Sequence, residues 1–241
     1  MILTAELSSQ GGREYNEDSV GIKERGQDAC VIVADGLGGH GGGKTASTIA
    51  VDGISTAWQN TAKISEEWML SVYTKVNADI LSMQTEACQM KTTCVSLFIE
   101  QEKAWWVHLG DSRLYHFVDG ILESQTVDHS VSQMAVLSGE ITLSQIRFHE
   151  DRNRVLRALG MEEPQPTYGQ ADLSDGRFHA FLLCTDGFWE YVLEDEMELD
   201  LAKVEQPEDW IRIMETRLQK KVNGKNDNYS AAALFFQSDR M

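Results

Sequence analysis

Short runs of apolar residues, each bounded by glycine or polar residues, recur along this chain and predict buried strands. They fall near residues 2–8, 18–24, 29–34, 93–99, 104–109, 113–118, 121–126, 167–172 and 178–185, with a final strand that contains Phe235 and Phe236. The four runs between residues 93 and 126 are separated only by short polar breaks. Strands joined without helices predict an antiparallel meander, and Val118-Asp119-Gly120-Ile121 predicts a tight hairpin within it.

Three segments carry apolar residues at helical spacing or the charge order of a helix. Residues 44–58 and 66–86 show apolar stripes, which predict helices that cover a sheet. Residues 207–222 open with acidic residues and close with two lysines, an order that complements the helix dipole. Residues 130–160 are mixed and polar, and we expect a helical excursion over the sheet edge. The pattern predicts an α+β fold.

Composition narrows the class of protein. A chain of 241 residues with three prolines suits one domain over residues 1–241. The formal charge of −17 disfavours binding to nucleic acid or to anionic membranes, both of which need basic patches. No run is apolar for long enough to span a bilayer, and the first nine residues lack signal-peptide features. We therefore expect a cytoplasmic protein, and a monomer.

The four cysteines show no paired spacing. Cys30, Cys88, Cys94 and Cys184 are scattered, and three of them lie within apolar runs. Such thiols are typical of a reducing compartment, so we expect all four to be buried and reduced.

Four aspartates stand where predicted strands begin or end. Asp35, Asp111 and Asp186 follow apolar runs and lie beside glycines, and Asp227 precedes the last run. If these strand ends meet at one rim, their carboxylates repel one another unless a cation neutralises them. Oxygen ligands suit Mg²⁺ or Mn²⁺ rather than Zn²⁺, and a bridging carboxylate can hold two ions. Asp-Gly pairs also form ordinary turns, but the whole set together favours a metal site.

Residues 38–45, Gly-Gly-His-Gly-Gly-Gly-Lys-Thr, offer a competing interpretation. They satisfy the phosphate-loop pattern GxxxxGK[ST] between a predicted strand and a predicted helix. Phosphate-loop folds need a parallel sheet with helical crossovers, which the predicted meander does not supply. Nucleotide hydrolysis is therefore the weaker alternative.

Taken in order, the motifs resemble those of the metal-dependent protein phosphatases, the type 2C serine/threonine family, in its bacterial branch. The matching segments are residues 13–19 (REYNEDS), 35–40 (DGLGGH), 92–93 (TT), 110–113 (GDSR), 126–130 (TVDHS), 157–160 (RALG), 185–187 (TDG) and 227–228 (DN). They run through nearly the whole chain in the family's order. The resemblance implies a two-sheet antiparallel β-sandwich flanked by helices on both faces, a four-layer αββα arrangement, with a flap-like excursion at about 128–160.

The resemblance also implies a set of metal ligands. Asp35 would bridge two Mn²⁺ or Mg²⁺ ions, and Gly36 would contribute its carbonyl oxygen. Asp186 and Asp227 would hold one of these ions. Asp111, together with Asp186, would form a weaker third site.

Other residues would serve the substrate and the water. The resemblance implies that Arg13 binds the substrate phosphate, for which a guanidinium fork is better suited than a lysine. Glu17, Asp18 and Asn228 would lie behind the ligands and act on metal-bound water. Leu37 occupies the position at which some family members carry a histidine that could be the general acid, so the acid is not identified.

The implied reaction is hydrolysis of phosphoserine and phosphothreonine on proteins by direct attack of a metal-bridged hydroxide. The sequence agrees independently, because it contains neither a cysteine with an arginine six positions on nor an Asp-x-Asp pair. The implied partners are phosphorylated proteins, the substrates of a Ser/Thr kinase. A catalytically silent phosphoprotein-binding module built on the same fold is the alternative, which the intact Asp35, Asp186 and Asp227 disfavour. We expect His40 to be solvated, His129 to make a structural hydrogen bond, and Arg113 to form a buried ion pair.

Overall fold

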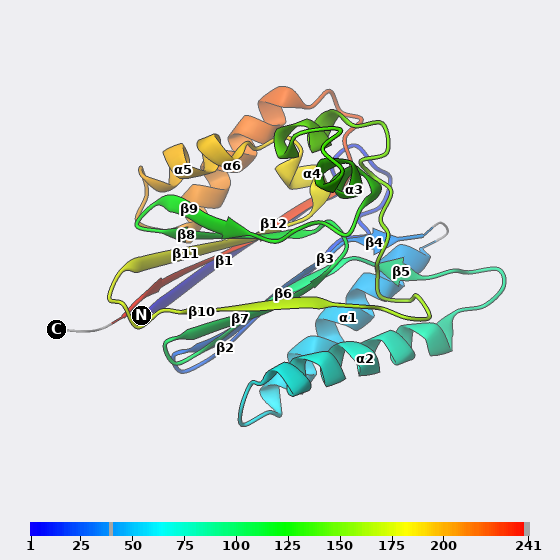
Figure 1. Ribbon diagram of the computed structural model, residues 1–241, viewed down its shortest axis with the longest axis horizontal. Coiled ribbons are helices and arrows are strands. Elements are labelled where there is room, and N and C mark those ends of the chain that lie inside the picture. The colour runs from blue at the N-terminus through cyan, green and yellow to red at the C-terminus, as the bar shows by residue number, and fades with distance from the viewer. Residues whose placement is uncertain (39–40, 239–241) are drawn as a thin grey trace.

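The computed structural model describes residues 1–38 and 41–238. Two five-stranded antiparallel sheets stack face to face, and helices cover the outer face of each (Figure 1). The predicted four-layer αββα architecture is confirmed. Gly39 and His40, and with them part of the 35–40 motif, lie outside the described residues.

The first sheet has the strand order β1-β12-β11-β8-β9. Its strands are β1 (Ile2–Ser9), β12 (Tyr229–Gln237), β11 (Phe178–Cys184), β8 (Arg113–Val118) and β9 (Ile121–Gln125). The two ends of the described chain pair with each other, because β1 and β12 run antiparallel along their full length.

The second sheet has the strand order β10-β7-β6-β3-β2. Its strands are β10 (Thr167–Asp172), β7 (Lys103–Leu109), β6 (Cys94–Glu100), β3 (Asp28–Ala34) and β2 (Ser19–Arg25). A short pair beside it consists of β4 (Gly36–Leu37) and β5 (Lys91–Thr92).

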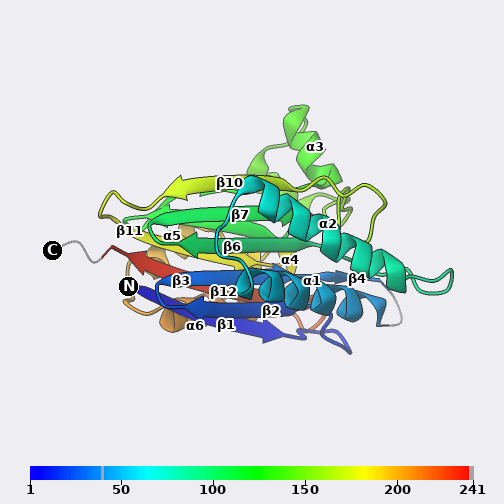
Figure 2. The same ribbon diagram turned by 90° about the horizontal axis from the view of Figure 1, so that it is seen from below.

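Helices cover the outer faces of both sheets. Helices α1 (Gly42–Gln59) and α2 (Glu66–Met83) cover the second sheet, as Figure 2 shows from below. Helices α5 (Glu194–Leu201) and α6 (Pro207–Lys221) cover the first. The remaining helices are α3 (Val131–Leu137), the 3₁₀ helix η1 (Leu143–Phe148) and α4 (Asp186–Trp189). In the part of the chain that the structure describes, no helix has the length and apolar character needed to cross a membrane.

Strand β12 shows how the sequence builds this sandwich. Ala231, Ala233 and Phe235 pack toward α5 and α6, whereas Leu234 and Phe236 pack between the sheets. Both faces of the strand are buried, so its residues form a continuous apolar run rather than an alternation of apolar and polar residues.

One prediction about connectivity needs correction. The four strands between residues 93 and 126 form two hairpins in two different sheets rather than one meander, because β7 pairs with β6 and β8 pairs with β9. The chain changes sheet after Gly110, whose φ of 97° is open to glycine at little cost. Helices α4 and α5 were not predicted at all. The Asp119-Gly120 hairpin is confirmed, with positive φ at both residues.

The cysteines follow the expectation in all but one case. All four thiols are free, and Cys30, Cys94 and Cys184 are buried, but Cys88 is only half-buried. Cys88 lies in the irregular segment after α2 rather than in a sheet, which explains its exposure.

Candidate metal centre

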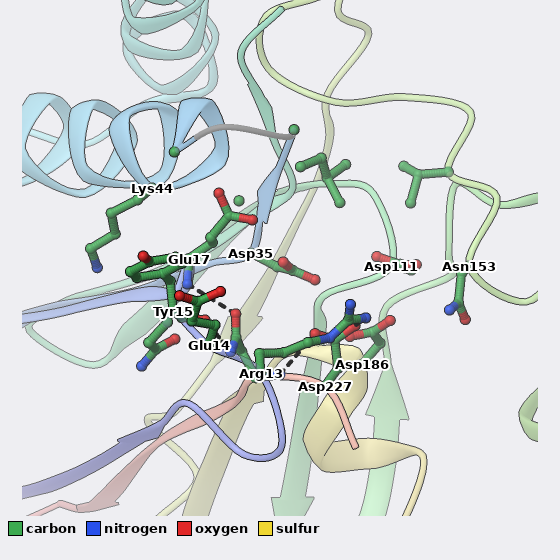
Figure 3. Close-up of a pocket in the computed structure, with 17 residues that line it drawn as sticks. Arg13, Glu14, Tyr15, Glu17, Asp35, Lys44, Asp111, Asn153, Asp186 and Asp227 are labelled. Carbon is green, nitrogen blue, oxygen red and sulfur yellow. Dashed lines mark hydrogen bonds and ion pairs between the residues drawn. The ribbon is translucent and has the colours of Figure 1, made fainter. Parts of the chain in front are cut away.

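The predicted acidic residues meet at one end of the sandwich. Asp35 follows β3, Asp111 follows β7, Asp186 opens α4 after β11, and Asp227 lies just before β12. All four line one cavity of about 930 Å³, and Figure 3 shows their side chains around a common space. Unrelated surface turns would not converge in this way, so the strand ends form one acidic site.

The paired threonines explain how Asp35 is held. The Thr92 hydroxyl and the Thr93 amide both donate to the Asp35 carbonyl oxygen, at 2.7 and 2.9 Å. The Thr93 hydroxyl accepts from the Asp35 amide at 3.2 Å. These bonds fix the backbone at the point where β3 leaves the sheet, which leaves the carboxylate free to face the cavity.

Asn228 connects the segments on the other side of the site. Its amide nitrogen Nδ2 donates to the Tyr15 carbonyl, and its Oδ1 accepts from the Glu17 amide, each at 2.9 Å. Gly187 packs against the same residue, because a Cβ atom there would lie 2.0 Å from the Asn228 carbonyl oxygen. The Asp-Gly sequence at 186–187 thus allows α4 and the start of β12 to approach at backbone contact distance.

Burial and mutual repulsion raise the pKa values of several carboxylates in this site. Burial and then repulsion from the neighbouring aspartates hold the pKa values of Asp35 and Asp186 well above their usual range. Burial, with repulsion from Asp128, raises the pKa of Asp111 to about 7. Burial raises the pKa of Asp18 to about 6, although the Thr185 hydroxyl donates to it. The site therefore disfavours its own negative charge unless a cation shares it.

Several oxygens in the site have no protein partner. Glu17 Oε1, Asp18 Oδ1 and Asp186 Oδ1 are buried without a hydrogen bond, and buried polar atoms normally have one. Among the described residues, no three Asp, Glu, His or Cys side chains enclose an ion by themselves. An all-oxygen site with few protein ligands fits Mg²⁺ or Mn²⁺, which retain several waters, better than it fits Zn²⁺.

Arg13 lies at the rim of this acidic site. Its guanidinium donates to Asp227 Oδ2 at 2.6 Å, and that hydrogen bond raises the arginine's pKa. The side chain is 57% exposed, so it remains accessible from solvent. Figure 3 shows it beside Asp227 and Asp186, where it could meet an anion that enters the cavity.

The structure adds residues that the sequence did not point to. Asn153 and Val155, from the 128–160 excursion, line the cavity. The Glu190 carboxylate raises the pKa values of Asp111 and Asp186 and accepts from Arg152 Nε at 2.8 Å. Helical spacing could have suggested Glu190, four residues after Asp186, but the short helix α4 carries no periodic signal.

The phosphate-loop alternative is wrong. Both large sheets are antiparallel, whereas that motif requires a parallel one. Lys44 Nζ donates to the Asp18 carbonyl at 2.6 Å and to the Ser19 hydroxyl at 3.0 Å. This lysine therefore anchors α1 to the segment before β2 instead of facing a nucleotide.

The predictions for two polar residues outside the proposed ligand set, Arg113 and His129, are confirmed. Arg113 forms a buried ion pair with Asp128, and both side chains are almost fully inaccessible. His129 makes hydrogen bonds with Gly110 and Thr167. Trp189 is also buried, whereas Trp105 and Trp106 are half-buried.

Comparison with known proteins gives one consistent result. A sequence profile described as protein phosphatase 2C matches residues 8–226. The serine/threonine phosphatase stp of Listeria monocytogenes serotype 4b (strain F2365) is 35% identical over 208 residues, which cover 80% of this chain and 81% of that protein.

Two solved structures extend the similarity to the fold. The Mycobacterium tuberculosis serine/threonine phosphatase PstP/Ppp superposes with a TM-score of 0.86 at 25% identity, covering 98% of this chain and 99% of the other. The catalytic domain of serine/threonine protein phosphatase PstP in complex with two manganese ions superposes with a TM-score of 0.79 at 26% identity, covering 97% of each chain. The chain therefore belongs to the protein phosphatase 2C family and is a metal-dependent serine/threonine protein phosphatase.

Proposed function

We propose that this cavity is the catalytic centre and that it holds two divalent cations, Mn²⁺ or Mg²⁺. Asp35 would bridge the two ions, with the Gly36 carbonyl, Asp186 and Asp227 as further ligands. Asp111, with Asp186, would form a weaker third site. The observation that carries this proposal is the convergence of the four aspartates on one cavity, where buried carboxylate oxygens have no protein partner.

The residues around the ions have separable tasks. When bound, the cations acidify water and offset the negative charge that develops on the phosphoryl oxygens. Glu17 and Asp18 would accept hydrogen bonds from water in the site, since each has a buried oxygen without a partner. Arg13 would orient the substrate phosphate with its guanidinium fork, exchanging its bond with Asp227 for the phosphate.

The wider context of the enzyme is also part of the proposal. Residues 1–241 would act as a single phosphatase domain, with the 128–160 excursion as a flap beside the cavity. The substrates would be proteins phosphorylated by a Ser/Thr kinase. A monomer in the cytoplasm, without nucleic-acid or membrane partners, agrees with the net charge of −17.

The decisive test is metal-dependent turnover. The purified protein should hydrolyse p-nitrophenyl phosphate and phosphothreonine peptides with Mn²⁺, and EDTA should abolish both activities. Asp35→Asn and Asp186→Asn should each lower kcat/KM by about 100-fold or more, because each removes a charged ligand. Asp52→Asn, at an exposed position of α1, is the matched control and should leave kcat/KM unchanged. Full activity of Asp35→Asn with metal present would exclude the proposed centre.

Arg13 is tested through the substrate constant. Arg13→Ala should raise KM for phosphopeptides by about 10-fold or more, since a charge-assisted hydrogen bond contributes about 1.5–3 kcal/mol. The effect on kcat should be smaller, because the source of the nucleophile is intact. Arg13→Lys retains the positive charge without the guanidinium fork, so its KM should fall between those of the wild type and Arg13→Ala. An unchanged KM in Arg13→Ala would contradict the assignment.

A further inference from the structure

His129 makes two hydrogen bonds with one residue, Gly110. The His129 amide donates to the Gly110 carbonyl at 2.8 Å, and the Gly110 amide donates to His129 Nδ1 at 3.2 Å. Gly110 directly precedes Asp111 and has a φ of 97°. The backbone turn that presents Asp111 to the cavity is therefore held on both sides by a single residue.

The same residue closes the base of the 128–160 flap. The Leu156 amide donates to the His129 carbonyl at 2.7 Å, and the Val131 amide donates to the Arg154 carbonyl at 2.9 Å. Ser130 and Val155 form a β-bridge between these two bonds. Val155 lines the cavity, so the bonds of His129 connect the Asp111 turn directly to the cavity-lining part of the flap.

The imidazole is suited to this task only in its neutral form. Burial and the neighbouring His108 lower the pKa of His129 to about 3. The two rings stack at 4.7 Å between centroids, with 1° between their planes. Nδ1 accepts from Gly110, so Nε2 must carry the ring hydrogen and donate it to the Thr167 hydroxyl at 2.9 Å.

We propose that His129 is a positioning residue, which aligns the Asp111 turn with the flap so that both face the same cavity. It does not touch the reacting atoms, and it acts through Gly110 and Leu156. The inference rests on the proposed function, because its consequence for metal use assumes that Asp111 faces a bound cation.

Two substitutions separate the hydrogen bonds of the ring. In His129→Asn the amide oxygen takes the place of Nδ1 and can still accept from Gly110. In His129→Gln the amide group takes the place of Nε2, so the bond with Thr167 can persist while the bond with Gly110 is lost. Thr167→Val is the matched control, since it removes only the outer bond.

Two measurements apply to each variant: the Mn²⁺ concentration for half-maximal hydrolysis of p-nitrophenyl phosphate, and amide hydrogen exchange at residues 110 and 156. His129→Gln should raise the half-activating Mn²⁺ concentration about 10-fold, the scale found for residues that orient metal ligands. Exchange at both amides should accelerate. His129→Asn and Thr167→Val should stay close to the wild type in both measurements.

The outcomes distinguish this inference from the proposed function. Equal effects of His129→Asn and His129→Gln, in proportion to their losses in melting temperature, would overturn the positioning role. Unchanged exchange and unchanged Mn²⁺ activation in His129→Gln would overturn it as well. A wild-type protein without Mn²⁺-dependent turnover would instead refute the proposed function, whereas the exchange comparison needs no catalysis and would still test the tie between turn and flap.

Discussion

Replacing Arg113 with methionine should destabilise the fold by about 3–5 kcal/mol, the range for removing one partner of a buried ion pair. Arg113 is 1% exposed, and its Nε and Nη2 donate to the two carboxylate oxygens of Asp128, each at 2.8 Å. Its Nη1 donates to the Tyr115 hydroxyl at 3.1 Å. The guanidinium also lies 3.6 Å from the centre of the Trp189 ring.

The magnitude follows from what the substitution leaves behind. Asp128, itself 5% exposed, would lose its two charge-assisted bonds and remain in a site from which water is excluded. The lost cation–π contact adds about 1–2 kcal/mol, which methionine packing against Trp189 offsets in part. A total stability of about 5–15 kcal/mol makes this a large fraction of the whole.

Urea unfolding at pH 7, followed by far-UV circular dichroism, measures the effect. Without Arg113, the Asp128 carboxylate would be a buried negative charge that has lost its partner, and this is the source of the expected deficit.

The double variant Arg113→Met/Asp128→Asn is the control for the pair. It removes both charges and should recover at least about 1 kcal/mol relative to Arg113→Met alone. A deficit below about 1 kcal/mol for Arg113→Met, or no recovery in the double variant, would refute the reasoning.

Two further predictions concern the site wall and the outer helices. Gly187→Ala should lower kcat/KM sharply and cost about 1–3 kcal/mol, because its Cβ would meet the Asn228 carbonyl oxygen; retained kcat/KM would show that the close approach is not needed. Asp200→Asn should cost about 1–3 kcal/mol at pH 7, measured by urea unfolding, because the buried carboxylate accepts hydrogen bonds from Arg217 and Lys203. Burial alone would raise the pKa of Asp200, but those bonds hold it below its ordinary value, so its contribution exists above pH 4 and is lost as the pH falls through the folded-state pKa. An equal deficit at pH 7 and pH 2 would count against that account.

The secondary structure of many segments could be predicted from residue patterns in the sequence. Strand β10 was predicted at its observed bounds, and helices α1, α2 and α6 within a few residues of theirs. Each is specified by residues that are neighbours in the sequence: apolar spacing, turn residues such as Asp119-Gly120, and charges at helix ends. The prediction of a metal site at the acidic set had a related basis, since aspartates recur where apolar runs begin or end.

Contacts between segments that are distant in the sequence could not be predicted in this way. Periodicity states which residues are buried but not which strand they pair with, so the passage from β7 into the other sheet at Gly110 went unseen. Helix α4 is too short to show helical periodicity in the sequence. No sequence pattern predicts that Glu190 pairs with Arg152. Asn153 and Val155 line the cavity from the 128–160 segment, in which the Leu156 amide donates to the His129 carbonyl, and neither contact has a local signal in the sequence.

The sequence alone therefore identified the aspartates of the site, because each of them lies next to the beginning or end of a strand. Only the tertiary structure decides that these carboxylates come close together, because they repel one another and no local sequence feature brings them into contact. Two buried sheet faces and the apolar contacts between them supply the free energy that holds these charges at one rim.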